Sequence, residues 1–157
     1  MALEIERKFL TTSDAWKAEA GDGVLFRQGY MTSGADKASV RVRIEGERAR
    51  LNIKSVTVGN SRLEYEYDIP VTDAEEMLEK LCNKPLIEKH RYFVKRHSQT
   101  LELDEFLGDN AGLVVAEVEL DHANQVVDLP DWIGREVTED TRYYNACLVN
   151  NPFKSWR

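Results

Sequence analysis

Apolar and polar residues alternate one by one along most of this chain. A period of two is typical of β-strands, because successive side chains of a strand point to opposite faces of the sheet. Turn-forming residues separate several of the alternating runs, at Glu45-Gly46, Gly59-Asn60 and Gly108-Asp109-Asn110. The pattern predicts strands at Ala2–Leu10, Val24–Thr32, Ala38–Ile44, Ala49–Ser55, Arg62–Ile69, Ile87–Arg96, Thr100–Phe106 and Val114–Leu120.

Helical spacing replaces this alternation in a few segments. The first helix is expected over residues 12–20. The second is expected to start with a capping box formed by Thr72 and Glu75, and to end before Pro85. A third is expected from about Asp140 to Val149, near the end of the sequence. These helices can cover part of the sheet's apolar face.

The polar face of the predicted strands carries charges of one sign at every second position. Residues two apart lie on the same side of a sheet, and like charges held there repel one another. A surface that only faces solvent has no need to sort its charges strand by strand. The groups that share a face are Glu4, Glu6 and Lys8; Arg41 and Arg43; Asn52 and Lys54; Glu64, Glu66 and Asp68; Lys89 and Arg91; Glu102 and Asp104; and Glu117 and Glu119.

If the sheet closes into a barrel, these charged faces line its lumen, and an eight-stranded barrel is wide enough to hold a small ligand. A lumen with a basic wall and an acidic wall suits a polyanion bridged to divalent cations. Carboxylate oxygens favour Mg²⁺ or Mn²⁺, and the three scattered histidines form no zinc motif. The donors expected to bind phosphate oxygens are Lys8, Arg41, Arg43, Lys54 and Arg91.

Length and charge narrow the choice further. The chain has 157 residues, which predicts a single domain over 1–157, and its net charge of −7 argues against a nucleic-acid coat or a basic membrane-surface protein. No apolar run approaches the ~18 residues of a membrane span, so we expect a cytoplasmic protein. Cys82 and Cys147 have no CxxC spacing and are expected to be reduced core residues. The sequence leaves open whether the protein forms a homodimer.

At these residues the sequence resembles the CYTH superfamily, the triphosphate tunnel metalloenzymes. The opening Glu4-Ile5-Glu6-Arg7-Lys8-Phe9 matches the E-x-E-x-K signature of that family. Further matches follow in the family's order: Gln28-Gly29-Tyr30-Met31, Val40-Arg41-Val42-Arg43, Ile53-Lys54, Glu64-Tyr65-Glu66, Glu88-Lys89-His90-Arg91-Tyr92, Leu103-Asp104-Glu105-Phe106, Ala116-Glu117-Val118-Glu119-Leu120, Val137-Thr138 and Arg142-Tyr143-Tyr144-Asn145.

The resemblance covers essentially the whole chain and is greatest to the short, stand-alone bacterial members. It implies an α+β fold: an eight-stranded antiparallel closed β-barrel with a charged lumen, a few covering helices and triphosphate bound inside. The sequence departs from the family in the hairpin His97-Ser98-Gln99-Thr100, where a glycine is expected.

The resemblance also implies roles for single residues. It assigns Glu4, Glu6, Glu117 and Glu119 as metal ligands, while Glu64, Glu66 and Asp104 are candidates for a second ion, directly or through water. Lys89 and Tyr30 resemble a lysine–tyrosine pair that activates the attacking water in short family members. Neighbouring cations such as Arg91 are expected to lower the pKa of Lys89, which suits a general base. The alternatives are a further phosphate ligand for Lys89 and an aromatic lining residue for Tyr30.

The leading hypothesis is therefore metal-dependent hydrolysis of inorganic tripolyphosphate, a small polyanion, with Mg²⁺ or Mn²⁺ as cofactor. Adenylyl cyclase, thiamine-triphosphatase and nucleoside-triphosphatase activities are alternatives on the same scaffold, although no base-recognition motif demands them. A non-enzymatic polyphosphate-binding module is a further alternative, but so many carboxylates would weaken anion binding alone. A lipid-binding barrel would need an apolar lumen.

Overall fold

Antiparallel strands form the framework of the molecule. The computed structural model describes residues 3–33, 37–56 and 61–156. Within them the strands are β1 (Leu3–Thr11), β2 (Val24–Tyr30), β3 (Ala38–Glu45), β4 (Arg48–Ser55), β5 (Ser61–Ile69), β6 (Ile87–Arg96), β7 (Gln99–Phe106), β8 (Val114–Glu119) and β9 (Ile133–Glu136). The helices are α1 (Val71–Lys80) and α2 (Asn145–Leu148), with short 3-10 helices η1 (Ala15–Ala18), η2 (Gly108–Asn110), η3 (Thr141–Tyr143) and η4 (Phe153–Ser155).

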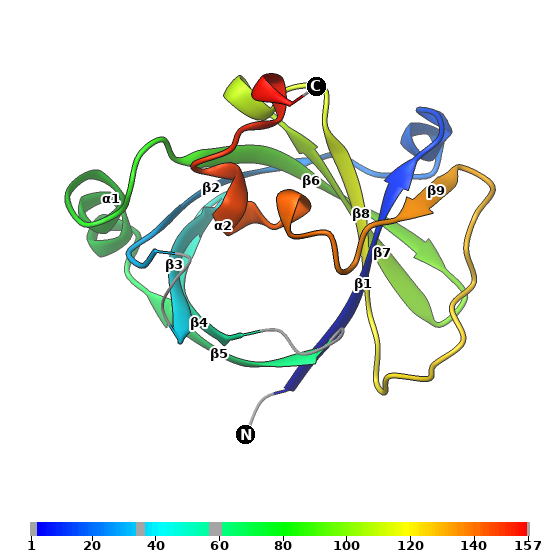
Figure 1. Cartoon of the computed structure of the whole chain (residues 1–157), viewed down its shortest axis with the longest axis horizontal. Coiled ribbons are helices and arrows are strands. Elements are labelled where there is room, and N and C mark those ends of the chain that lie inside the picture. The colour runs from blue at the N-terminus through cyan, green and yellow to red at the C-terminus, as the bar shows by residue number, and fades with distance from the viewer. Residues whose placement is uncertain (1–2, 34–36, 57–60, 157) are drawn as a thin grey trace.

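The strands close into a barrel through β1. The sheet runs in the order β5-β4-β3-β2-β6-β7-β8-β1-β9, and a further β5–β1 pairing joins its two sides into the ring seen in Figure 1. Every pairing is antiparallel. The expected eight-stranded antiparallel barrel is therefore confirmed. β9 is an additional strand that the sequence pattern did not predict, and it pairs with the end of β1.

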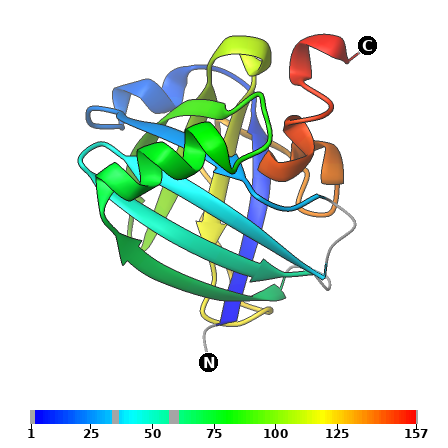
Figure 2. The same ribbon diagram turned by 90° about the vertical axis from the view of Figure 1, so that its left-hand side faces the viewer.

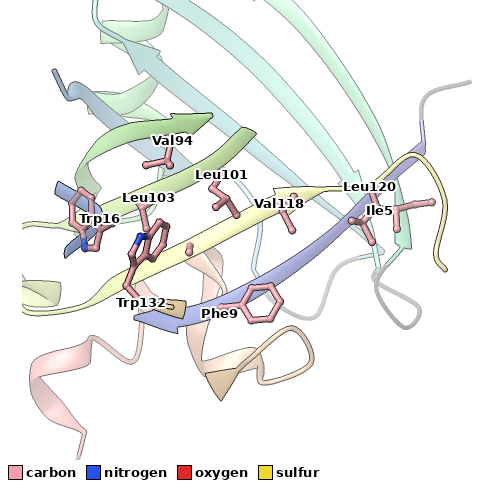
Figure 3. Close-up of a cluster of buried hydrophobic side chains, with 10 residues drawn as sticks. Ile5, Phe9, Trp16, Val94, Leu101, Leu103, Val118, Leu120 and Trp132 are labelled. Atoms are coloured by element: carbon pink, nitrogen blue, oxygen red, sulfur yellow. The ribbon is translucent and has the colours of Figure 1, made fainter. Parts of the chain in front are cut away.

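Three apolar clusters of the described residues hold this ring in place. One lies on the outer side of β1, β6, β7 and β8, where Trp16 and Trp132 pack over it (Figure 3). The second lies beneath α1, which crosses the outside of β3 and β4 (Figure 2). The third joins Tyr30, Ile87 and Phe106 to the C-terminal segment that contains α2. That segment lies across one part of the ring in Figure 1.

The helical segments differ from the sequence-based predictions. The expected first helix is only the single 3-10 turn η1. Pro70 occupies the N-cap of α1 in extended conformation, so the helix begins before Thr72 and the predicted capping box is wrong. The expected third helix is split into η3 and α2, because the backbone of Tyr144 is extended between them.

Gly46 and His97 adopt the left-handed backbone conformation in turns. Gly46 has a positive φ of 59° in the β3–β4 turn, whereas the predicted Gly59-Asn60 turn lies outside the described residues. His97, with φ of 54°, adopts the left-handed conformation in the hairpin where a glycine was expected.

Both cysteines are free, and Cys82 is buried. Among the described residues, none of the helices has the length and apolar character needed to cross a membrane.

Candidate active site

A cavity of about 640 Å³ occupies the barrel interior, and each of the strands β1 to β8 contributes side chains to its wall. This follows from the alternation in sequence: the polar face of each strand turns inward and the apolar face packs outward. The residues predicted for the site that line the cavity are Glu4, Glu6, Lys8, Tyr30, Arg41, Arg43, Lys54, Glu64, Glu66, Lys89, Arg91, Glu117 and Glu119. Asp104 is the one predicted site residue outside this lining.

The basic side of the cavity is centred on β2 and its two neighbours. The guanidinium carbons of Arg43 on β3 and Arg91 on β6 each lie 4.7 Å from the ring centre of Phe26 on β2. Because β3 and β6 flank β2, the Phe26 ring lies between the two guanidinium groups, and its electron-rich π system can interact with each of them. Burial, with repulsion from Arg41 and Arg91, lowers the pKa of Arg43 to about 10. An anion entering here meets buried positive charge.

Asp104 lies beneath this basic side. Its carboxylate accepts hydrogen bonds from Arg91 Nε at 2.7 Å and Nη2 at 2.9 Å, and pairs with Lys89 Nζ at 2.7 Å. Although burial opposes ionisation, Arg91 and Lys89 hold the pKa of Asp104 well below its usual range. Both oxygens are thus in contact with cations, and Asp104 is not part of the group formed by Glu4, Glu64 and Glu119.

Lys89 is almost fully buried, with 1% of its side chain exposed. Burial lowers its pKa to about 7; Asp104 opposes this shift, and Arg91 and Arg43 add to it. The direction agrees with the sequence-based expectation, but the largest cause is desolvation rather than repulsion between like charges. Nζ also donates to Oδ1 of Asn145 at 2.8 Å.

Tyr30 is connected to Lys89 indirectly. Gln28 Nε2 donates to the Tyr30 hydroxyl at 3.5 Å and to Asn145 Oδ1 at 3.1 Å, the same oxygen that accepts from Lys89. The side chain of Gln28 is fully buried, so this arrangement lies inside the protein rather than at its surface. Asn145, from α2, therefore ties the C-terminal segment to the charged interior.

The acidic side is centred on β1, β5 and β8. Carboxylate oxygens of Glu4, Glu64 and Glu119 lie within 4.8 Å of one another. Glu119 is the exposed member, and it forms no ion pair with the described residues. Partial burial and the neighbouring carboxylates, of which Glu102 acts most strongly, raise the pKa of Glu119 to about 7. This carboxylate therefore lacks a positive partner.

The other predicted carboxylates have cationic partners. Glu6 and Glu117 lie 3.8 Å and 3.2 Å from the ammonium of Lys8. Glu66 accepts hydrogen bonds from Arg50 and Asn52 at 3.0 Å and 3.2 Å, so it lies on the basic side rather than with the acidic group.

The oxygen atoms of the acidic group fit a hard divalent ion. Ligands on opposite sides of Mg²⁺ stand about 4 Å apart, since each bond is ~2.1 Å long. A small inward movement would therefore bring Glu4, Glu64 and Glu119 onto one ion. Glu119 has no cationic partner among the described residues, which favours binding of a cation there. All three members of the group are carboxylates, and this favours Mg²⁺ or Mn²⁺ over zinc.

Several lining residues were not predicted from the sequence. The structure adds Phe26, Asn145 and Arg62, whereas Glu102 was already expected on the lumen face of its strand. The signal for Arg62 was present, because it precedes Glu64 by two positions on the same strand face. Asn145 lies in a matched motif, but its bond to Lys89 depends on where the C-terminal segment folds.

Comparison with known proteins agrees with this geometry. A family model described as the CYTH domain matches residues 2–147. An inorganic triphosphatase of Acetivibrio thermocellus is 54% identical over 157 residues, covering 100% of this chain and 99% of that protein. An inorganic triphosphatase of Nitrosomonas europaea is 41% identical, covering 93% and 96%. A crystal structure of an inorganic triphosphatase superposes with a TM-score of 0.66 at 38% identity, covering 95% of each chain.

Proposed function

The chain belongs to the CYTH domain family, and from this premise we propose that it hydrolyses inorganic tripolyphosphate inside the barrel with the help of a divalent metal ion. The observation that carries the proposal is the division of one 640 Å³ cavity into a basic side and an acidic side. A triphosphate needs buried cations along its oxygens, and its metal counter-ion needs carboxylates. Both are present in one space, and two relatives that match 100% and 93% of this chain are inorganic triphosphatases.

The buried cations of the cavity bind the substrate. Arg41, Arg43 and Arg91 provide planar guanidinium groups that can hold phosphate oxygens in pairs, and Lys8 and Lys54 provide compact charges. Hydrolysis of a phosphoanhydride depends mainly on positioning and charge stabilisation, which fixed buried cations supply without reorganisation. Burial of these side chains therefore serves the transition state as well as binding.

The carboxylates Glu4, Glu64 and Glu119 would hold the metal ion, with Glu6 and Glu117 beside them. Bound there, Mg²⁺ or Mn²⁺ would supply positive charge to the phosphate oxygens and would help to activate water. Asp104 keeps Lys89 and Arg91 in place rather than binding the ion.

Lys89 acts as the general base in this proposal. With a pKa of about 7, Nζ is neutral in a large fraction of molecules near neutral pH and can accept a proton from the attacking water. Asn145 and Asp104 fix the position of Nζ, and Gln28 links the Tyr30 hydroxyl to the same Asn145 oxygen.

The proposal extends to the whole chain: residues 1–157 form one cytoplasmic domain that acts on a small polyanion, with neither nucleic acid nor membrane as a partner. Whether two copies associate is decided by sedimentation of the purified protein. A Hippeastrum protein named for adenylyl cyclase activity, with a dominant triphosphatase activity, matches at a TM-score of 0.57, but at 15% identity this likeness shows the fold alone. The ring of Phe26 is already in contact with two guanidiniums and only 4% exposed, so it offers no free face to a nucleotide base.

The deciding experiment measures phosphate release from tripolyphosphate, ATP, thiamine triphosphate and pyrophosphate, each with Mg²⁺, Mn²⁺ or EDTA. We expect the highest kcat/KM for tripolyphosphate, and we expect that activity to be lost in EDTA. Faster turnover of ATP or thiamine triphosphate would replace the proposed substrate. Full activity in EDTA would remove the metal from the mechanism.

A further inference from the structure

Arg62 lies at the seam where the barrel closes. In the β1–β5 pairing it stands directly opposite Glu4, and its side chain points into the cavity with only 18% exposed. Nε donates to Glu4 Oε2 at 3.3 Å, and Nη2 donates to Glu6 Oε1 at 3.3 Å. One guanidinium thus bridges two carboxylates of β1.

A second cation, Lys54, also forms an ion pair with Glu4. Lys54 Nζ lies 3.0 Å from Glu4 Oε2 and 3.5 Å from an oxygen of Glu64. Glu4 and Glu64 also belong to the group whose oxygens lie within 4.8 Å of Glu119. A divalent ion at this group would therefore take up oxygens that already have positive partners.

The two resident cations hold these carboxylates differently. Lys54 offers a single ammonium group to Glu4 and Glu64, whereas Arg62 bridges Glu4 and Glu6 with two nitrogens of one guanidinium. A guanidinium keeps its charge at any working pH. Arg62 can make room for a divalent ion only by moving its side chain away from Glu4 and Glu6.

We propose that Arg62 is a resident counter-cation that competes with the divalent ion for Glu4 and Glu6, and that its displacement by the ion turns it toward the anionic substrate. The first half concerns metal binding alone; the second half rests on the proposed function. In the metal-free protein Arg62 is held by carboxylates and adds little to anion binding. Once the ion has replaced it, the freed guanidinium faces the cavity, so metal binding and anion binding favour each other.

The test compares Arg62→Gln with the wild-type chain in a calorimetric titration with Mn²⁺ alone. Removing the competitor is expected to tighten Mn²⁺ binding at least about tenfold, because loss of a charge-assisted hydrogen bond typically changes a binding constant by about that factor or more. Arg48→Gln is the matched control. It removes the same charge from the neighbouring strand, but Arg48 is 62% exposed and pairs only with Asp68 among the described residues. Its Mn²⁺ affinity should stay within about twofold of the wild type.

A second titration follows the imido analogue of tripolyphosphate, in EDTA and with saturating Mn²⁺. Arg62→Gln is expected to bind the analogue as the wild type does in EDTA, and several-fold more weakly with Mn²⁺. Should the glutamine variant not fold, Arg62→Lys keeps the charge but loses the bridging geometry, and Mn²⁺ affinity is expected to rise in the same direction by a smaller factor.

A purely structural role of Arg62 would give a different result. If Arg62 only fastens β1 to β5, both variants will lower the melting temperature and leave Mn²⁺ affinity unchanged or weaker, which overturns the proposal. Absence of Mn²⁺ binding in every variant overturns it as well. Failure of the wild type to hydrolyse tripolyphosphate would instead refute the proposed function, while the titration with Mn²⁺ alone would still decide the competition.

Discussion

Replacing Asp104 by asparagine tests how the basic side of the cavity is held together. Asp104 is 2% exposed, and its two oxygens take three donors, two from Arg91 and one from Lys89. Asparagine has nearly the same shape but no charge, and its NH₂ group would face a donor. The substitution leaves buried cations without their shared counter-charge.

The expected cost follows from that geometry. Removing one partner of a buried ion pair typically costs about 3–5 kcal/mol. For a chain of this length, 1 kcal/mol corresponds to about 2–4 °C in melting temperature. Asp104→Asn should therefore melt about 6–20 °C below the wild type in EDTA. Because the charge of Asp104 holds the pKa of Lys89 up, the variant's Lys89 loses its proton more easily, and the deficit should be larger at pH 6 than at pH 9.

Thermal unfolding in EDTA at pH 6 and pH 9 measures both effects. Asp68→Asn is the matched control: its carboxylate is 72% exposed and pairs with Arg48 and Arg50, so it should change the melting temperature by less than about 2 °C. An Asp104→Asn variant that melts with the wild type would show that the three hydrogen bonds do not organise the site. Unchanged stability with weakened Mn²⁺ binding would restore Asp104 as a metal ligand.

Three further predictions concern the reaction itself. Glu117→Gln and Glu119→Gln should each lower kcat for tripolyphosphate by at least ~10²-fold while the fold is kept, and near-wild-type rates in both would remove these residues from the metal site. Arg41→Ala and Arg43→Ala should raise KM strongly; unchanged constants in steady-state assays would place both arginines outside the substrate path. The wild-type rate should rise with pH through about 7, as Lys89 loses its proton, and fall below that pH, where the ammonium cannot accept one. Lys89→Arg should bind tripolyphosphate, turn over far more slowly and lose this pH dependence; an unchanged profile would leave Lys89 a phosphate ligand.

The strands were predictable because their two faces differ so sharply in chemistry. Arg41 and Arg43 alternate with Val42 and Ile44. This contrast between the two faces is local to the strand and does not depend on which strands lie beside it. β9 was missed because it has four residues, one of them a glycine, too few to show a period. The expectation that charged faces converge inside a barrel needed only the alternation and closure of the sheet.

Pairings across the cavity could not be read from the sequence. The bond from Arg62 to Glu4 joins residues 58 positions apart and depends on the register at the seam. The pKa of Lys89 depends mostly on burial, which requires the complete barrel, including Asn145. Asp104 shares the alternation of the metal-ligand candidates, and only the folded positions of Lys89 and Arg91 show that they contact both of its oxygens.

The central position of β1 has a consequence for how the protein is made. This strand is the earliest of the described strands to be synthesised, yet it pairs with β5 at its start, with β8 along its middle and with β9 at its end. Arg7 of β1 bonds Glu136, 129 residues further along. Such distant contacts form late and slow folding. During synthesis the ring therefore stays open until β8 has been made. For most of translation Glu4, Glu6 and Lys8 are present in the nascent chain, but the closed cavity that they line has not yet formed.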